Sequence, residues 1–185
     1  GDDQYFAGNV PIGNVLKLPF LIQSYEEYDK AAEIVRPYVV EGYEKLGVTV
    51  LADYVYPMQY LWGRSEITSL DGINGAKIRV ASPEAGEAIS RFGGGSVTLG
   101  ASEVPAALDR GVVDGIITGT VCADLWQDML NTGYLLGLNY NNVYIIVNTQ
   151  AFEGLTPEQQ EAARTAAENA AKWDTETMRS DDQAL

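Results

Sequence analysis

Apolar positions along the chain follow two spacings, one typical of short strands and the other typical of helices. Short apolar runs predict strands over residues 48–55, 76–81, 96–99 and 115–118. A continuous apolar run over residues 144–148 predicts a further, buried strand. Helical patterns separate most of these runs, so we expect an α/β fold with a largely parallel sheet.

The helices carry clear start signals. Ser24 and Glu27 form a capping box, so the first helix is expected to begin near Ser24. Pro37 is expected to interrupt that helix, because proline lacks an N–H and clashes with the preceding turn. Ser82 and the proline after it predict the start of a second helix. Further helices are expected over residues 102–111 and 121–131.

The last third of the chain predicts one long helix. The run 156–159 combines an N-cap threonine, a proline at the first helical position and a capping-box glutamine. One face of this helix is expected to pack against the fold, and it carries Ala162, Ala163, Ala166, Ala170, Trp173 and Thr177. Trp173 is therefore expected in the core, and so is Trp126 on the helix expected over residues 121–131.

Composition and charge exclude several classes of function. The 185 residues include 12 basic and 26 acidic side chains, and the net charge of −14 opposes binding to nucleic acid or to an anionic membrane surface. The chain has no histidine, which excludes Ser-His-Asp catalysis and histidine-bound metals. No apolar run is long enough for a membrane span, so direct membrane insertion is not expected. We expect neither a metal nor a cofactor.

Arg79 stands out, because it lies between Ile78 and Val80 in a predicted strand. An unpaired buried guanidinium is costly, so this side chain must either reach solvent or be held in a polar cleft. In the first case it forms an ion pair with an acidic residue on a solvated sheet edge. In the second case its ligand should be an anion.

Several motifs in this order resemble a known family, the extracytoplasmic solute-binding proteins of tripartite ATP-independent periplasmic (TRAP) transporters, of the DctP-like group. The first is Leu-Pro-Phe-Leu at residues 18–21, and the second is Gly-Ala-Lys-Ile-Arg-Val at residues 75–80. The match continues through Glu103-Val104, through Gly-Val-Val-Asp-Gly at residues 111–115, and through Val147-Asn148. The resemblance covers nearly the whole chain.

The resemblance implies an α/β fold of the two-lobed periplasmic binding protein type, with mixed sheets, hinge strands and a long C-terminal helix. Residues 1–56 would form part of lobe I, residues 57–142 lobe II, and residues 143–185 a crossing strand that returns to lobe I. Family members begin with a strand, a helix and a second strand that are missing here, so lobe I is expected to be incomplete. Such a protein is periplasmic, and its leader is absent from this chain.

The function implied by the resemblance is the capture of a small organic acid and its delivery to the TRAP permease subunits in the membrane. The family's arginine in the Lys-Ile-Arg-Val strand binds the ligand carboxylate, and Arg79 occupies that position. Thr118 matches a polar contact at a strand end, where many members carry an asparagine. Gln59 falls where a second arginine is common, which argues against a strongly acidic ligand.

Other predicted pocket residues are mostly aromatic, because rings can enclose the carbon skeleton of a ligand. The alternative for each ring is ordinary core packing, and for the asparagine it is a turn. These candidates are Tyr56, Tyr60, Trp62, Tyr140 and Asn142.

Two other functions stay open from the sequence. The same fold serves as a sensor domain that feeds a signalling receptor instead of a permease. An enzyme would need a nucleophile or an acid-base pair, and no such arrangement is recognisable without histidine. The expectation is therefore a binding protein and not an enzyme.

Overall fold

The computed structural model describes residues 8–183, which fold into two units. The first unit contains the described residues up to Lys17, the segment Leu21–Tyr56 and the chain from Tyr140 onward. The second unit contains Leu18–Phe20 and Pro57–Asn139. Each unit has its own sheet and its own helices, and each is described by itself below.

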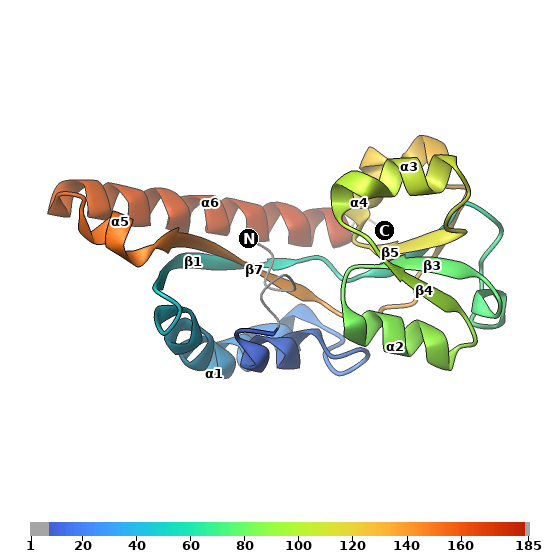
Figure 1. Cartoon of the computed structure of the whole chain (residues 1–185), viewed down its shortest axis with the longest axis horizontal. Coiled ribbons are helices and arrows are strands. Elements are labelled where there is room, and N and C mark those ends of the chain that lie inside the picture. Colours follow the sequence, from blue (N-terminus) through green and yellow to red (C-terminus); the bar gives the residue numbers. More distant parts are fainter. Residues whose placement is uncertain (1–7, 184–185) are drawn as a thin grey trace. The chain divides into compact units, whose positions relative to one another are not determined.

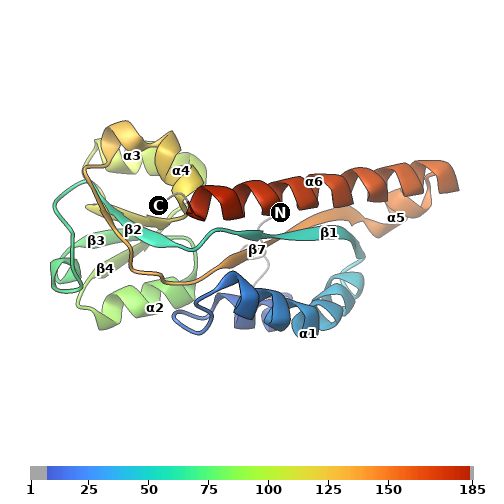
Figure 2. The same ribbon diagram turned by 180° about the vertical axis from the view of Figure 1, so that it is seen from behind.

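The first unit is built on a two-stranded antiparallel sheet. Strand β1 (Val48–Tyr56) pairs with β7 (Asn141–Asn148) along its whole length, apart from a bulge near Val50. Helix α6 runs along one face of this sheet and α1 covers the opposite face (Figures 1 and 2). The helices of this unit are η2 (Pro11–Lys17), α1 (Tyr25–Glu44), α5 (Thr149–Glu153) and α6 (Pro157–Gln183).

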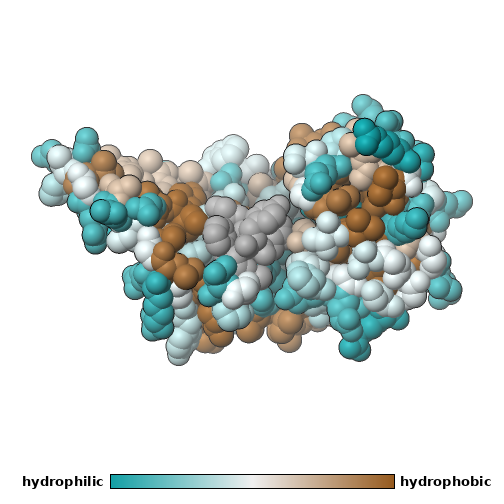
Figure 3. Space-filling model, in the orientation of Figure 1, coloured by the Kyte–Doolittle hydropathy of each residue, from teal (hydrophilic) through white to brown (hydrophobic). Residues whose placement is uncertain are grey.

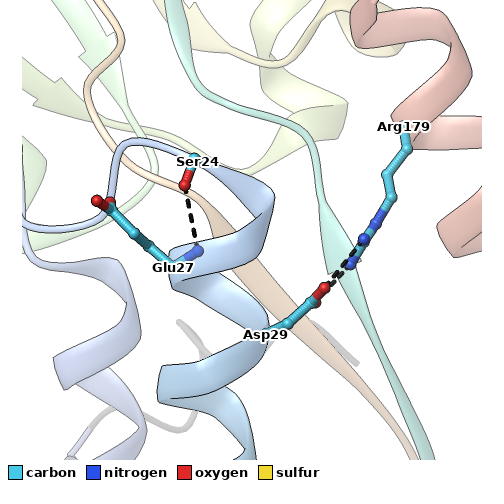
Figure 4. Close-up of polar contacts among 4 residues, drawn as sticks. All are labelled: Ser24, Glu27, Asp29 and Arg179. Atoms are coloured by element: carbon cyan, nitrogen blue, oxygen red, sulfur yellow. Dashed lines mark hydrogen bonds and ion pairs between the residues drawn. The ribbon is translucent and has the colours of Figure 1, made fainter.

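Helix α1 begins as predicted, but it does not break at Pro37. The hydroxyl of Ser24 accepts a hydrogen bond from the Glu27 backbone N–H, which caps the helix (Figure 4). Pro37 is exposed, and the helix continues through it as one piece. Val35 and Val39 on either side are buried, and this packing holds the helix together where one backbone hydrogen bond is lost.

Helix α6 begins as predicted at Pro157, but the face it buries is not the predicted one. Ala167 and Ala171 are buried against Ala52 of β1, whereas Ala166 and Ala170 are exposed. The expected core position of Trp173 is wrong, because this side chain is 65% exposed. The contact face is rotated by about one residue, or 100°, from the predicted one.

The end of α6 is fastened to the start of α1. Arg179 forms two hydrogen bonds with the carboxylate of Asp29 (Figure 4), and its guanidinium stacks 4.7 Å from the centre of the Tyr25 ring. Tyr25 donates a hydrogen bond to Asp182. Burial and the Asp182 carboxylate raise the pKa of Tyr25 far above its usual value, so the phenol remains the donor.

The second unit contains a mixed five-stranded sheet in the order β4-β3-β5-β2-β6. Strand β3 lies between β4 and β5 and is parallel to both, while β2 is antiparallel to β5 and to β6. Helix α2 covers one face of the sheet, and α3 and α4 cover the other (Figures 1 and 2). The strands are β2 (Tyr60–Gly63), β3 (Lys77–Val80), β4 (Gly95–Thr98), β5 (Gly115–Thr118) and β6 (Thr132–Tyr134). The helices are η3 (Asp71–Ile73), α2 (Pro83–Arg91), η4 (Ala101–Glu103), α3 (Val104–Asp109), α4 (Thr120–Leu125) and η5 (Gln127–Met129).

Most predicted elements of the second unit are present, with two corrections. Strands β2 and β6 were not expected, and β2 makes the sheet mixed. The helix expected over residues 121–131 is shorter, because α4 ends at Leu125 and the backbone is extended again at Leu130. Apolar cores lie on both faces of the sheet, with Leu61 and Ile78 in one and Leu108 and Ile116 in the other.

Apolar and polar surface are interspersed on the visible face of the second unit (Figure 3). Its exposed large apolar side chains include Val112 and Leu125. Among residues 8–183, no helix combines the length and the apolar character needed to cross a membrane.

We predict that Arg179→Met lowers the free energy of unfolding by about 1 kcal/mol, because it removes a two-bond ion pair and a cation–π contact that are only partly exposed to solvent. Urea denaturation would measure the change. The matched control is Lys172→Met, which removes a 3.9 Å ion pair between well-exposed side chains and should change stability little. Equal losses in the two variants would show that Arg179 does not fasten α6 to α1.

Candidate ligand-binding site

Arg79 lies in the interior of the sheet of the second unit. Its strand, β3, is flanked on both sides by hydrogen-bonded strands, and its neighbours Ile78 and Val80 are fully buried. Arg79 itself is only 4% exposed. The solvated sheet edge of the alternative is therefore wrong, because β3 is not an edge strand and the Arg79 side chain is buried.

Backbone carbonyl groups orient the guanidinium of Arg79. Its Nε and Nη2 atoms donate to the carbonyl oxygen of Leu99, at 2.9 and 2.7 Å, and Nη1 donates to that of Ile117 at 3.4 Å. A carbonyl oxygen fixes the direction of a guanidinium but carries no formal charge that would neutralise it. These bonds therefore hold a positive charge in a fixed place.

The guanidinium is held at the carboxyl ends of the three parallel strands β4, β3 and β5, which from here on are called the carboxyl edge of the sheet. Leu99 follows the last residue of β4, and Ile117 is the last residue but one of β5. Open α/β sheets bind their ligands outside the carboxyl ends of parallel strands. The backbone of the second unit thus presents Arg79 at the edge of the sheet where an anion would be recognised.

Thr118 ends β5 at the same edge. It is 4% exposed and pairs with Tyr60 across the sheet, and its carbonyl oxygen accepts a hydrogen bond from the indole N–H of Trp62 at 2.9 Å. Thr118 therefore directly follows Ile117, whose carbonyl accepts a hydrogen bond from Arg79. Thr120, two residues later, was not considered from the sequence, yet its hydroxyl is buried and makes no hydrogen bond within residues 8–183.

The other predicted residues of the second unit have structural contacts. Trp62 packs partly in the core beside Ile116, and the rings of Tyr60 and Trp62 meet edge to face with centres 6.4 Å apart. Gln59 is buried, and its side-chain amide donates to the carbonyl of Pro57 at 2.8 Å. These contacts position the chain on one side of β5, and ligand contact by these residues stays a prediction.

Three predicted residues belong to the first unit. Tyr140 is 4% exposed and packs against Tyr25 and Tyr28, with ring centres 4.8 and 5.8 Å away. Asn142 is fully buried and donates to the hydroxyl of Tyr144, while Tyr56 pairs with Asn141 in the sheet. Tyr140 thus has the packing role that was its alternative, and ligand contact by any of the three stays a prediction.

The side chains at this position offer hydrogen bonds and one positive charge. Among residues 8–183, no cluster of three acidic or cysteine side chains could hold a metal ion. The groups at the carboxyl ends of the parallel strands include a guanidinium and threonine hydroxyls, which can donate hydrogen bonds to a small anion. The main-chain carbonyls there are acceptors, and they orient the guanidinium instead.

Solved structures show which class of protein has this fold. An extracytoplasmic solute receptor of Bordetella pertussis that binds pyroglutamic acid matches with a TM-score of 0.91 and 22% identity, over 99% of this chain and 62% of the receptor. A TRAP periplasmic solute-binding protein from Sulfitobacter sp. NAS-14.1, with bound β-D-galacturonate, matches with a TM-score of 0.87 and 22% identity, over 99% and 63%. One from Ralstonia eutropha H16, with bound (S)-2-acetolactate, matches with a TM-score of 0.88 and 25% identity, over 97% and 59%.

The fold is therefore the mixed α/β fold of the two-lobed periplasmic solute receptors. The family model of the bacterial extracellular solute-binding proteins, family 7, called DctP, matches residues 2–185. The protein belongs to this family, as the sequence motifs indicated. The family and its solved members are solute receptors and not enzymes. The chain spans about three fifths of the length of the solved receptors described above.

We predict that Trp62→Phe lowers the free energy of unfolding by about 1 kcal/mol, because the carbonyl of Thr118 loses its indole donor in a partly buried place. Chemical denaturation followed by circular dichroism would measure it. Trp173→Phe is the control, since this exposed side chain should contribute within about 0.5 kcal/mol. If Trp62→Phe is as neutral as the control, the indole does not support the end of β5.

Proposed function

We propose that the protein is a periplasmic receptor that binds a small organic acid through its carboxylate and delivers it to a TRAP permease in the membrane. The observation that carries the proposal is the guanidinium of Arg79, which is almost fully buried and is directed by the carbonyls of Leu99 and Ile117 at the carboxyl edge of the sheet. A planar guanidinium can bind both oxygens of a carboxylate at once. Membership in a family of extracellular solute-binding proteins supports the same conclusion.

The ligands of the solved relatives narrow the class of acid. Pyroglutamate, galacturonate, glucuronate and 2-acetolactate each have a single carboxylate, and in each the carbon next to it carries a nitrogen or an oxygen atom. We extend this class, a monocarboxylate with a polar atom on the adjacent carbon, to the present protein. Gln59, at the position where a second arginine is common in the family, agrees with a singly charged ligand.

Arg79→Met should abolish binding of the acid, with a loss of affinity of at least about 100-fold, because it removes a charged hydrogen-bonding group from a water-poor site. Isothermal titration calorimetry with pyroglutamate, galacturonate and 2-acetolactate would measure this, with succinate as a dicarboxylate for comparison. The protein should be prepared as its gene encodes it. Circular dichroism must show that the variant is folded, because the carbonyls of Leu99 and Ile117 lose their donor.

The matched control is Arg91→Met, which removes an exposed arginine of α2 that pairs only with Glu87 on the same helix among the described residues. It should leave the affinity unchanged. Undiminished binding by Arg79→Met would exclude Arg79 as the carboxylate anchor. A wild-type protein that binds none of the monocarboxylates would contradict the proposed function itself.

A further inference from the structure

A buried hydroxyl lies at the start of α4, just after the strand whose Ile117 carbonyl accepts a hydrogen bond from Arg79. Thr120 is the first residue of α4 and follows β5 after a single extended residue, Gly119. It is 7% exposed, and its Oγ1 atom is buried and makes no hydrogen bond with any described residue. Burying a hydroxyl without a partner costs free energy, so such a group in a folded protein calls for an explanation.

The backbone places Thr120 a few residues after the carbonyl that holds the guanidinium. Thr120 is three residues beyond Ile117, whose carbonyl accepts a hydrogen bond from Arg79, so their Cα atoms are at most about 11 Å apart. Because Nη1 of Arg79 is 3.4 Å from that carbonyl, a small molecule bound by the guanidinium would lie close to the start of α4. Ser82, which follows β3 at the same edge, provides a contrast, because its hydroxyl accepts a hydrogen bond from Ala85 and caps α2.

We propose that the hydroxyl of Thr120 recognises the polar atom on the carbon next to the carboxylate and so determines which acids the site accepts. This inference rests on the proposed function. A threonine hydroxyl has one donor and two acceptor sites, so it accepts from an N–H or O–H group and donates to a carbonyl or ring oxygen. One residue therefore serves lactams, hydroxy acids and uronates, whereas an acid with only C–H groups there leaves the hydroxyl unpaired.

An unpaired buried hydroxyl would make the site selective for acids that can form a hydrogen bond with it. A site with a buried polar atom discriminates strongly against a ligand that cannot pair with it, because the desolvation cost of the atom is then not recovered. Arg79 would bind any carboxylate, and Thr120 selects among carboxylates. The same hydroxyl destabilises the protein when no ligand pairs with it.

The test compares two acids that differ by a single hydroxyl, 2-hydroxyisovalerate and isovalerate. The wild type should bind the hydroxy acid at least about 10-fold more tightly. Thr120→Val has nearly the same shape and should remove this preference while isovalerate binds as before. Thr120→Ser keeps a hydroxyl and should keep the preference.

A second measurement separates recognition from a purely structural role. If the hydroxyl is unpaired without ligand, Thr120→Val should raise the melting temperature of the ligand-free protein by roughly 2–4 °C. Thr68→Val, at an exposed position of the second unit, is the control and should change neither the preference nor the melting temperature. A structural hydroxyl predicts the opposite for Thr120→Val, a lower melting temperature and an unchanged preference, and this result would overturn the assignment.

The two proposals fail in different ways. If the wild type binds neither of these acids nor any member of the monocarboxylate panel, the proposed function is wrong, and the role of Thr120 with it. If the wild type prefers the hydroxy acid and Thr120→Val retains that preference, only the assignment of Thr120 is wrong.

Discussion

The charge of Arg79 in the interior of a sheet is the constraint on which the second unit depends. Removing a charged group from water costs several kcal/mol unless hydrogen bonds replace its hydration. Here the carbonyls of Leu99, just after β4, and of Ile117 in β5 supply such bonds from both sides of β3. The guanidinium is therefore placed correctly only when β4, β3 and β5 are assembled in this order, so the geometry of the site and the topology of the sheet depend on each other.

Local signals in the sequence predicted the start of each major helix, because caps such as Ser24, Ser82 and the 156–159 run act within one turn. Strands β2 and β6 escaped prediction, since a short antiparallel strand is stabilised by partners distant in sequence. The face of α6 was misplaced for another reason. Alanine occupies both of two adjacent stripes, and Trp173 indicated the wrong one although it lies in solvent.

The candidate site was predictable to a similar degree. Arg79 could be found because a cation between two apolar residues conflicts with its surroundings, and such conflicts are expected at functional positions. For Trp62 the sequence left a pocket ring and core packing open. The structure adds that its indole N–H donates to the carbonyl of Thr118, and its ligand contact stays a prediction. Thr120 carries no signal in the sequence, since a threonine at the start of a helix is ordinary. Its importance depends on burial and on a missing hydrogen bond, which only three-dimensional packing determines.

In the proposed receptor, affinity and selectivity have separate physical sources. The net charge of −14 opposes the approach of an anionic ligand, but this long-range repulsion is screened within about 8–10 Å at physiological salt. An arginine enclosed by protein acts at shorter range and in a lower dielectric, so in the proposed receptor its attraction would outweigh the repulsion once a carboxylate is bound. Such attraction is nearly the same for every carboxylate. Discrimination between carboxylates must therefore come from buried neutral groups that contact the rest of the ligand. A buried polar group without a partner lowers the stability of the ligand-free protein, and the same cost disfavours every ligand that cannot pair with it.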